Sequence, residues 1–269
     1  MPLQRALVEA LSSEPFCTLL QGIAEIPLGR RALNWLSRPY SVYPTFDEAW
    51  SAARKVSPFS HEHPGVVELQ LKHSRTLRAS DYAVLYWLSH IEATVLKVFD
   101  FGGNVGNLFY SYLPYCPGSV EWTVFDLPAT VAQGRELAKN RNAEGLAFAD
   151  SVQEFSREQI LLVSGAFHYW QEDVEAFLRQ FPQTPQHVLI NRSPFAETQA
   201  SYVTVQRTDF CAMPCRVWNA EEVISAFAQQ GYRLVDRWRA LELALRLPLF
   251  PELSVPSYSG FYFSRPDRT

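Results

Sequence analysis

The spacing of hydrophobic positions changes along the chain at about residue 94. Before that point, apolar residues recur at helical spacing in LQRALVEALSS, RRALNWLSR and FDEAWSAARKV, and prolines separate these segments. The segment DYAVLYWLSHIEA has a wide aromatic and aliphatic face, and we expect Ser80 to cap its amino end. The pattern predicts that residues 1–90 form a helical lid over the domain that follows.

After that point, runs of β-branched and aromatic residues alternate with helical segments. The expected strands are TVLKVFDF, EWTVFDL, ILLVSG, HVLIN, YRLVDRW and GFYFSR. The expected helices are ATVAQGRELAKNR, EDVEAFLRQF and NAEEVISAFAQQGY, the last with Asn219 as its amino cap and Gly231 as its stop. This alternation predicts an α/β fold over residues 91–269, with a doubly wound, mostly parallel, Rossmann-like sheet and one antiparallel strand at GFYFSR.

Composition and charge narrow the classes of function. The chain has 269 residues, of which 47% are hydrophobic, and a formal net charge of −4. It has no basic stripe, so we expect no nucleic-acid partner. No run has the apolar length that spans a bilayer, and Arg5 and Glu9 interrupt the amino end before the apolar core of a signal peptide could form. We expect a cytoplasmic protein that acts on a small molecule without a membrane partner.

Cysteines and histidines do not predict a metal site. The four cysteines are Cys17, Cys116, Cys211 and Cys215. The CxxxC spacing of the last two lacks the second pair that a zinc site would need, and free thiols fit a reducing compartment. Three histidines gather in one polar, proline-containing stretch, namely His61, His63 and His73. We expect no metal there.

The stretch VFDFGGNVGN follows an expected strand and precedes a helix-like segment. A glycine-rich turn in this context indicates a nucleotide-type ligand, because backbone can approach a ligand closely only where no Cβ intervenes. The glycines are Gly102, Gly103 and Gly106, and their spacing is not the GxGxxG of dinucleotide sites. Asp100, at the end of the strand, can accept from an ammonium group or fix the turn.

Two more acids follow the next apolar runs. Asp126, in VFDLP, stands where a carboxylate can take both ribose hydroxyls. Asp150, in AFADS, could accept from an adenine amino group or could cap a helix. No Walker lysine follows the glycines, so the three acids favour an adenosine that carries an amino acid rather than a phosphate. The remaining expected cofactor residues are Leu127, Ser151 and Phe167.

Seven segments in order resemble those of a class I S-adenosylmethionine (SAM)-dependent methyltransferase, and more narrowly a bacterial methyltransferase family that carries a DFGG motif. They are VFDFGG, EWTVFDLP, AFADS, LLVSGAFHYW, VLINRSPF, SYVTVQ and YSGFYFSR. The resemblance implies SAM as the cofactor. Two positions depart from the pattern: Asn104 replaces the usual third glycine, and Asn191 replaces the aspartate of the family's DRTPF.

The segment AFHYWQED is similar to the LHxWxDE segment of small-molecule O-methyltransferases, whose histidine is a general base. The resemblance therefore makes His168 a candidate base, although it could also line the pocket or cap a helix. The catalytic candidates are His168, Tyr169 and Asn191. The substrate candidates are Trp170, Ser193, Tyr202 and Tyr258, and Tyr169 and Trp170 could also attract a sulfonium by cation–π contact.

The long segment NRSPFAETQASYVTVQRTDFCAMPCRVW shows no clear periodicity. We interpret it as a loop near the cofactor, either a substrate lid or an excursion that packs on the N-terminal helices.

Three functions are open at this stage. The first is methyl transfer from SAM to a nitrogen or oxygen of a small metabolite. The second is cyclisation of SAM to azetidine-2-carboxylate with release of methylthioadenosine, because some similar bacterial enzymes are azetidine-2-carboxylate synthases. The two would share every cofactor residue, so the sequence leaves them level. The third and less favoured is a non-catalytic SAM-binding protein.

Overall fold

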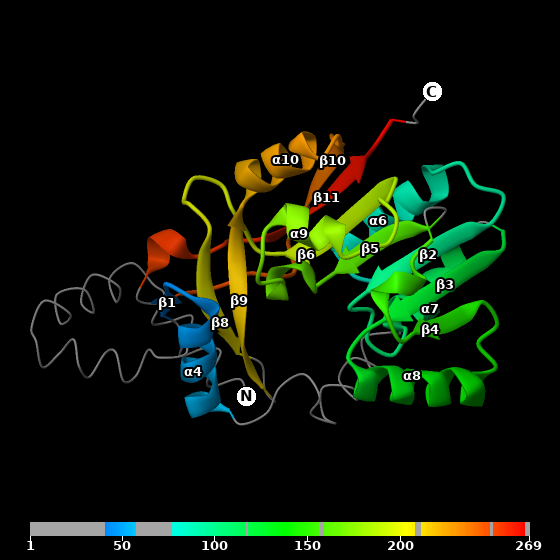
Figure 1. The fold of residues 1–269 in the computed structure, drawn as a ribbon, viewed down its shortest axis with the longest axis horizontal. Coiled ribbons are helices and arrows are strands. Elements are labelled where there is room, and N and C mark those ends of the chain that lie inside the picture. The colour runs from blue at the N-terminus through cyan, green and yellow to red at the C-terminus, as the bar shows by residue number, and fades with distance from the viewer. Residues whose placement is uncertain are drawn as a thin grey trace, which may run out of the picture.

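The computed structural model describes residues 41–57, 77–116, 118–156, 159–207, 211–247 and 250–266. Several expectations lie outside these ranges: the helices LQRALVEALSS and RRALNWLSR, Cys17, and the three clustered histidines His61, His63 and His73. The described part contains two sheets with helices packed against them (Figure 1). No helix in the described ranges has the length and apolarity to cross a membrane.

The larger sheet has seven strands in the order β10-β11-β6-β5-β2-β3-β4. The parallel strands are β2 (Leu96–Phe101), β3 (Val120–Phe125), β4 (Leu146–Ala149), β5 (Ile160–Ser164) and β6 (His187–Ser193). Strand β11 (Tyr258–Ser264) runs antiparallel to β6 and to β10 (Arg233–Ala240). This confirms the expected α/β sheet and the antiparallel strand at GFYFSR. Strand β4 is four residues long, and the pattern of apolar residues did not predict it.

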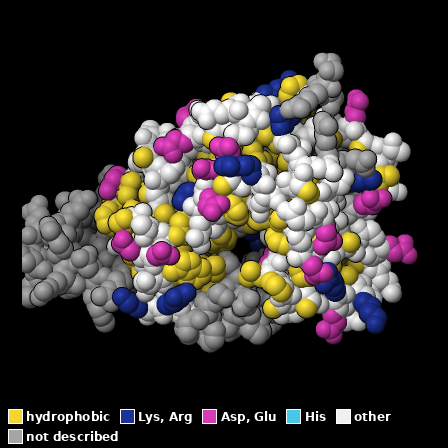
Figure 2. Space-filling view, in the orientation of Figure 1, with side chains coloured by type: hydrophobic (Ala, Val, Ile, Leu, Met, Phe, Trp, Pro, Cys, Tyr) yellow, Lys and Arg dark blue, Asp and Glu magenta, His cyan; other side chains and the backbone are white. Residues whose placement is uncertain are grey.

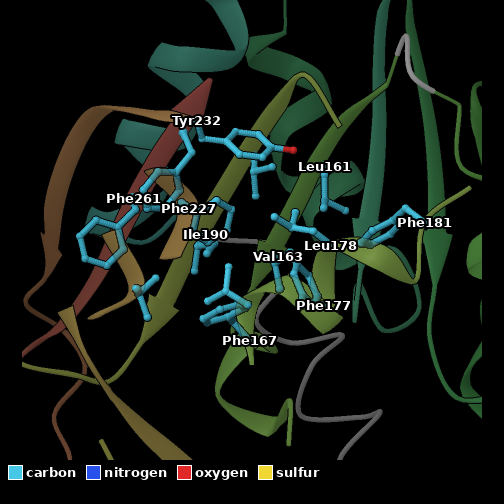
Figure 3. Packing of buried hydrophobic residues seen from close by; sticks show 14 of the residues in the cluster. Leu161, Val163, Phe167, Phe177, Leu178, Phe181, Ile190, Phe227, Tyr232 and Phe261 are labelled. Atoms are coloured by element: carbon cyan, nitrogen blue, oxygen red, sulfur yellow. The ribbon is translucent and has the colours of Figure 1, made fainter. Parts of the chain in front are cut away.

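Helices cover both faces of this sheet. They are α6 (Ala79–His90), α7 (Asn107–Tyr112), α8 (Pro128–Arg141), α9 (Val174–Arg179) and α10 (Ala220–Gln229). Neighbouring strand residues alternate between the two faces, so Val98 and Leu162 pack with α6, α7 and α8, whereas Phe99 and Leu161 pack with α9 and α10. Figure 3 shows part of the second cluster, with Leu161 near Leu178 of α9. The central strands are therefore buried on both sides, which explains their continuous apolar sequence.

The smaller sheet has the order β1-β8-β9-β7. Its strands are β1 (Val42–Tyr43), β7 (Phe195–Ala196), β8 (Tyr202–Arg207) and β9 (Ala212–Asn219), and α4 (Phe46–Val56) packs on it (Figure 1). The interpretation of residues 191–218 as an irregular loop is therefore wrong, because β8 and β9 form an antiparallel hairpin. In β8, the three consecutive residues Val203, Thr204 and Val205 are all buried, which removes the alternation that would reveal a strand.

The N-terminal expectations are met in part. Helix α4 forms where FDEAWSAARKV predicts it. In the second half of the chain, α10 has Asn219 as its amino cap, as expected. Residues 42–43 form a strand within the region expected to be helical. Helix α6 begins at Ala79, so Ser80 is not its cap; the hydroxyl of Ser80 instead donates to Glu242. The division into a lid of residues 1–90 and a domain of residues 91–269 stays a prediction.

Four 3-10 helices complete the described elements: η2 (Leu113–Tyr115), η3 (Val152–Glu154), η4 (Phe167–Tyr169) and η5 (Pro251–Leu253).

Candidate functional site

A cavity of about 630 Å³ lies at the carboxyl ends of β2, β3 and β5. Ligands bind at this edge in open α/β sheets, and the volume falls within the usual range of small-molecule sites. Side chains from β8 and β9 line the cavity as well, so both sheets contribute to its wall. Figure 2 shows a hollow near the centre of this face of the molecule, bordered by hydrophobic side chains.

The glycine turn after β2 is packed from both sides. A Cβ on Gly102 would lie 2.4 Å from the Cβ of Ala166, and one on Gly103 would lie 2.5 Å from Oδ2 of Asp100. Asn104 has φ of 55°, a left-handed conformation that asparagine adopts more readily than most residues. The departure from glycine at this position therefore keeps the geometry of the turn. Gly106 caps α7 and does not line the cavity.

Asp126, just beyond β3, is held by two backbone groups. Its Oδ2 accepts from the backbone N–H of Asn104 at 2.8 Å, and its Oδ1 accepts from the backbone N–H of Leu127 at 2.6 Å. Burial raises the pKa of this carboxyl, and the two hydrogen bonds oppose that rise. Each carboxylate oxygen has a second lone pair, so Asp126 can accept two more hydrogen bonds from a ligand in the cavity that it lines.

Asp150 lines the cavity in a more exposed position beyond β4. It forms an ion pair with Nη1 of Arg135 at 2.9 Å, and this hydrogen bond lowers the pKa of Asp150. Leu127 lines the same part of the cavity. Ser151 does not line the cavity. Its hydroxyl accepts from the backbone N–H of Gln153 and caps η3.

Asp100 lies beneath the glycine turn and is fully buried. Its Oδ2 accepts from Nε1 of Trp122 at 3.1 Å, whereas its Oδ1 has no hydrogen-bond partner among the described residues. Burial raises the pKa of Asp100 to about 7, with a further rise from the charge of Asp126 and an opposing effect of the Trp122 hydrogen bond. Asp100 supports the turn from below and does not line the cavity.

An aromatic segment after β5 forms the opposite wall, where His168, Tyr169 and Trp170 all line the cavity. His168 is 2% exposed, and its Nδ1 lies 3.4 Å from Oγ of the buried Ser193, which itself lies outside the cavity wall. The ring of His168 packs on that of Tyr169, with centroids 4.2 Å apart. Tyr258, from the start of β11, also lines this wall.

Three further sequence-predicted residues lie outside the cavity wall, besides Asp100, Gly106, Ser151 and Ser193. Phe167 stacks on Trp218 in the core, and Tyr202 donates to the backbone oxygen of Leu253. Asn191 is fully buried: its Oδ1 accepts from Nε1 of Trp238 at 2.9 Å, and its Nδ2 donates to Oγ of Ser164 at 3.4 Å. The side chains of Asn191 and Tyr202 therefore do not line the cavity.

Sequence reasoning missed a charged part of the wall that contains Arg78, Asp81 and Arg192. Arg192 forms an ion pair with the buried Asp81 and donates to Oγ of Ser80 at 3.0 Å. The guanidinium of Arg78 has no ion-pair or hydrogen-bond partner among the described residues, and burial and the charge of Arg192 lower its pKa. Arg192 stands in the quoted segment VLINRSPF, but its partners are more than 100 positions away in the sequence.

Gln206, at the end of the quoted segment SYVTVQ, was also missed. Its Oε1 accepts from the hydroxyl of Tyr169 at 2.6 Å, and its Nε2 donates to the hydroxyl of Tyr258 at 3.3 Å. Gln206 lines the cavity and links the smaller sheet to the larger one there.

We predict that Asp100→Asn stabilises the protein increasingly as the pH rises from about 4 to about 7. The folded protein keeps the Asp100 proton up to about pH 7, whereas the unfolded chain releases it near its ordinary pKa, so ionisation of Asp100 destabilises the fold over that interval. Asparagine has no such proton to lose. The gain at pH 8 should be roughly 2–4 kcal/mol in the free energy of unfolding, measured by urea titration.

The control is Glu121→Gln, which removes an exposed acid from the adjacent strand β3. This carboxylate is exposed and lies 3.8 Å from Nζ of Lys97, so the effect of Glu121→Gln should change by less than about 1 kcal/mol over the same pH range. A difference between wild type and Asp100→Asn that is constant with pH would contradict the proposed burial of the Asp100 proton.

Comparison with known proteins gives matches among solved structures only: no protein-family model and no curated protein matches the chain. The 1,6-didemethyltoxoflavin-N1-methyltransferase of Burkholderia thailandensis, solved with 1,6-didemethyltoxoflavin and S-adenosylhomocysteine (SAH) bound, has 16% sequence identity and a TM-score of 0.51. That match covers 84% of this chain and 93% of the other. The glycopeptide N-methyltransferase MtfA, solved with SAM, has 11% identity and a TM-score of 0.47, covering 71% of this chain and 96% of the other.

The similarity to the Burkholderia enzyme, together with the strand order and the single antiparallel strand, establishes the fold. The chain has the Rossmann-like fold of the class I methyltransferases.

Proposed function

We propose that the protein is a SAM-dependent enzyme that transfers a methyl group to a nitrogen or oxygen of a small metabolite. The observation that carries this proposal is a single cavity that joins Asp126 and the glycine turn to an aromatic wall. The first two features suit an adenosine, and the third suits a positively charged sulfonium. The fold that the chain shares with the Burkholderia methyltransferase supports the same function.

The residues present fit SAM along the length of the cavity. Asp126 keeps one free lone pair on each oxygen and would accept from both ribose hydroxyls. Leu127 and Asp150 would contact the adenine, and the turn at Gly102 and Gly103 would bring backbone close to the ligand. Arg78, whose guanidinium has no partner among the described residues, would pair with the carboxylate of the amino-acid part.

When bound, SAM supplies an electrophilic methyl group on sulfur. The rings of Tyr169, Trp170 and Tyr258 would face the sulfonium and attract its charge by cation–π contact while excluding water. The wall would hold the nucleophile in line with the carbon–sulfur bond, which breaks as the new bond forms and leaves its electron pair on sulfur. His168 lines the cavity and can receive the proton that the nucleophile loses, but orientation and desolvation, rather than this proton transfer, set most of the rate.

The position of Arg78 and Asp81 in the cavity wall also supports residues 1–90 as a lid on the domain of residues 91–269.

The test of the function is to incubate the purified protein with SAM, alone and with a panel of small amines, phenols and heteroaromatic compounds, and to follow the products by mass spectrometry. We expect SAH to appear only when an acceptor is present. Methylthioadenosine formed from SAM alone would instead show cyclisation to azetidine-2-carboxylate. SAM that binds and stays unchanged under every condition would exclude cyclisation and leave methylation of an acceptor outside the panel or a non-catalytic binding protein.

Asp126→Ala should weaken the binding of SAH by roughly 1.5–3 kcal/mol, or about ten- to hundredfold in Kd, because the ribose hydroxyls lose a charged acceptor. Isothermal titration calorimetry measures the effect. Glu121→Ala, which changes an exposed acid of β3, is the matched control and should leave the affinity unchanged. Wild-type affinity in Asp126→Ala, with the variant still folded, would remove Asp126 from the binding site.

His168→Gln should slow the formation of SAH by less than about tenfold and leave the affinity for SAH unchanged. Attack on a sulfonium carbon depends more on orientation and desolvation than on a base, and glutamine can still contact Ser193. His187→Gln, at a histidine whose ring contacts Tyr262, serves as the control. A loss of 10²–10⁴-fold, the usual range for a general base, with SAH affinity intact would show instead that His168 takes the proton.

A further inference from the structure

Three side chains form a hydrogen-bonded chain across the aromatic wall. Tyr169 comes from η4, Gln206 from β8 and Tyr258 from β11. The 2.6 Å between the hydroxyl of Tyr169 and Oε1 of Gln206 is the length of an O–H···O bond, shorter than is usual for N–H···O. This distance fixes the amide, with its oxygen toward Tyr169 and its Nε2 toward the hydroxyl of Tyr258, 3.3 Å away.

The orientation of the amide decides what Tyr258 can offer to a ligand. Because its hydroxyl oxygen accepts from Gln206, its own hydrogen is available to another acceptor, and no described residue takes it. The side chain is 3% exposed and lines the cavity. A buried donor without an acceptor costs about 1–3 kcal/mol, so a ligand that brings an acceptor atom would gain affinity here.

The surroundings of this donor are aromatic and apolar, apart from His168, whose ring centroid lies 6.1 Å from that of Tyr258. Trp170 follows Tyr169, Met213 is the cross-strand neighbour of Gln206, and the backbone oxygen of Leu243 accepts from the N–H of Tyr258. All three side chains line the cavity. Burial raises the pKa values of Tyr169 and Tyr258, so both hydroxyls stay protonated. Such a wall suits a flat molecule whose acceptor atom is neutral, because an anion buried against it would lose hydration without a counter-charge.

We propose that this wall is the subsite for the methyl acceptor, and that Tyr258 donates a hydrogen bond to a neutral acceptor atom of that molecule. The acceptor atom is a carbonyl oxygen or an unprotonated ring nitrogen on a ring-containing compound. Gln206 acts as a positioning residue that directs the hydrogen of Tyr258 into the cavity. The identity of this molecule as the methyl acceptor rests on the proposed function.

The test uses two probes that share a benzene ring. Benzamide carries a neutral carbonyl acceptor, and benzylammonium carries a cationic donor with no acceptor. Each is titrated by ligand-observed NMR into the full-length protein, with and without SAH. We expect benzamide to bind at least about tenfold more tightly than benzylammonium, the ratio that one satisfied buried hydrogen bond provides.

Two variants separate the role of the hydroxyl from the shape of the wall. Tyr258→Phe removes the donor and keeps the ring. Gln206→Glu, examined at pH 8, keeps Tyr258 in place, but its carboxylate accepts from both tyrosine hydroxyls and so draws the hydrogen of Tyr258 away from the cavity. Both should lower the affinity for benzamide about tenfold. Tyr232→Phe, at a buried tyrosine that donates to the backbone oxygen of Pro185, is the matched control and should have no effect.

The proposal is overturned if wild type does not bind benzamide, if it binds benzamide no better than benzylammonium, or if both variants keep wild-type affinity for benzamide. The proposed function is contradicted by a different result, namely that the protein does not bind SAH. The titrations without SAH test the subsite in either case.

Discussion

The carboxylate of Asp126 and the backbone N–H of Asn104 form the contact on which the candidate site depends. This 2.8 Å hydrogen bond ties the turn after β2 to the end of β3, beside a second link from the N–H of Gly102 to the backbone oxygen of Phe125. The parallel register of β2 and β3 brings these groups together, since Phe101 lies opposite Phe125. These two hydrogen bonds hold the turn in the position in which Gly102 and Gly103 line the cavity.

The rest of the cavity wall depends on the packing of the smaller sheet against the larger one. The β8–β9 hairpin brings Gln206 to the aromatic segment that follows β5, and the hydrogen bonds of Gln206 to Tyr169 and Tyr258 join the two sheets at that point. On the charged part of the wall, the ion pair of Arg192 with Asp81 joins the end of β6 to α6. Arg78 lines the same part of the wall and forms no ion pair with any described residue.

Features that depend on neighbouring residues were predictable from the sequence. The parallel strands appear as continuous apolar runs, and Asp126 was found because an acid follows such a run directly. Features that depend on contacts between distant segments were not predictable. Arg192 and Asp81 are far apart in the chain. Gln206 lies in β8, where three consecutive buried residues hide the alternation, and Asn191 was assigned to the site although the oxygen of its amide accepts from Trp238. The cap assigned to Ser80 failed for the same reason, since Glu242, a residue from another segment, takes its hydroxyl.

A crystal structure of the protein with SAH is the most direct measurement of the central claim, that one cavity holds an adenosine at Asp126 and a sulfur centre at the aromatic wall. The account predicts both ribose hydroxyls on the carboxylate of Asp126, and the sulfur facing the rings of Tyr169, Trp170 and Tyr258. SAH bound elsewhere on the protein, or bound in this cavity with its ribose away from Asp126, would contradict it.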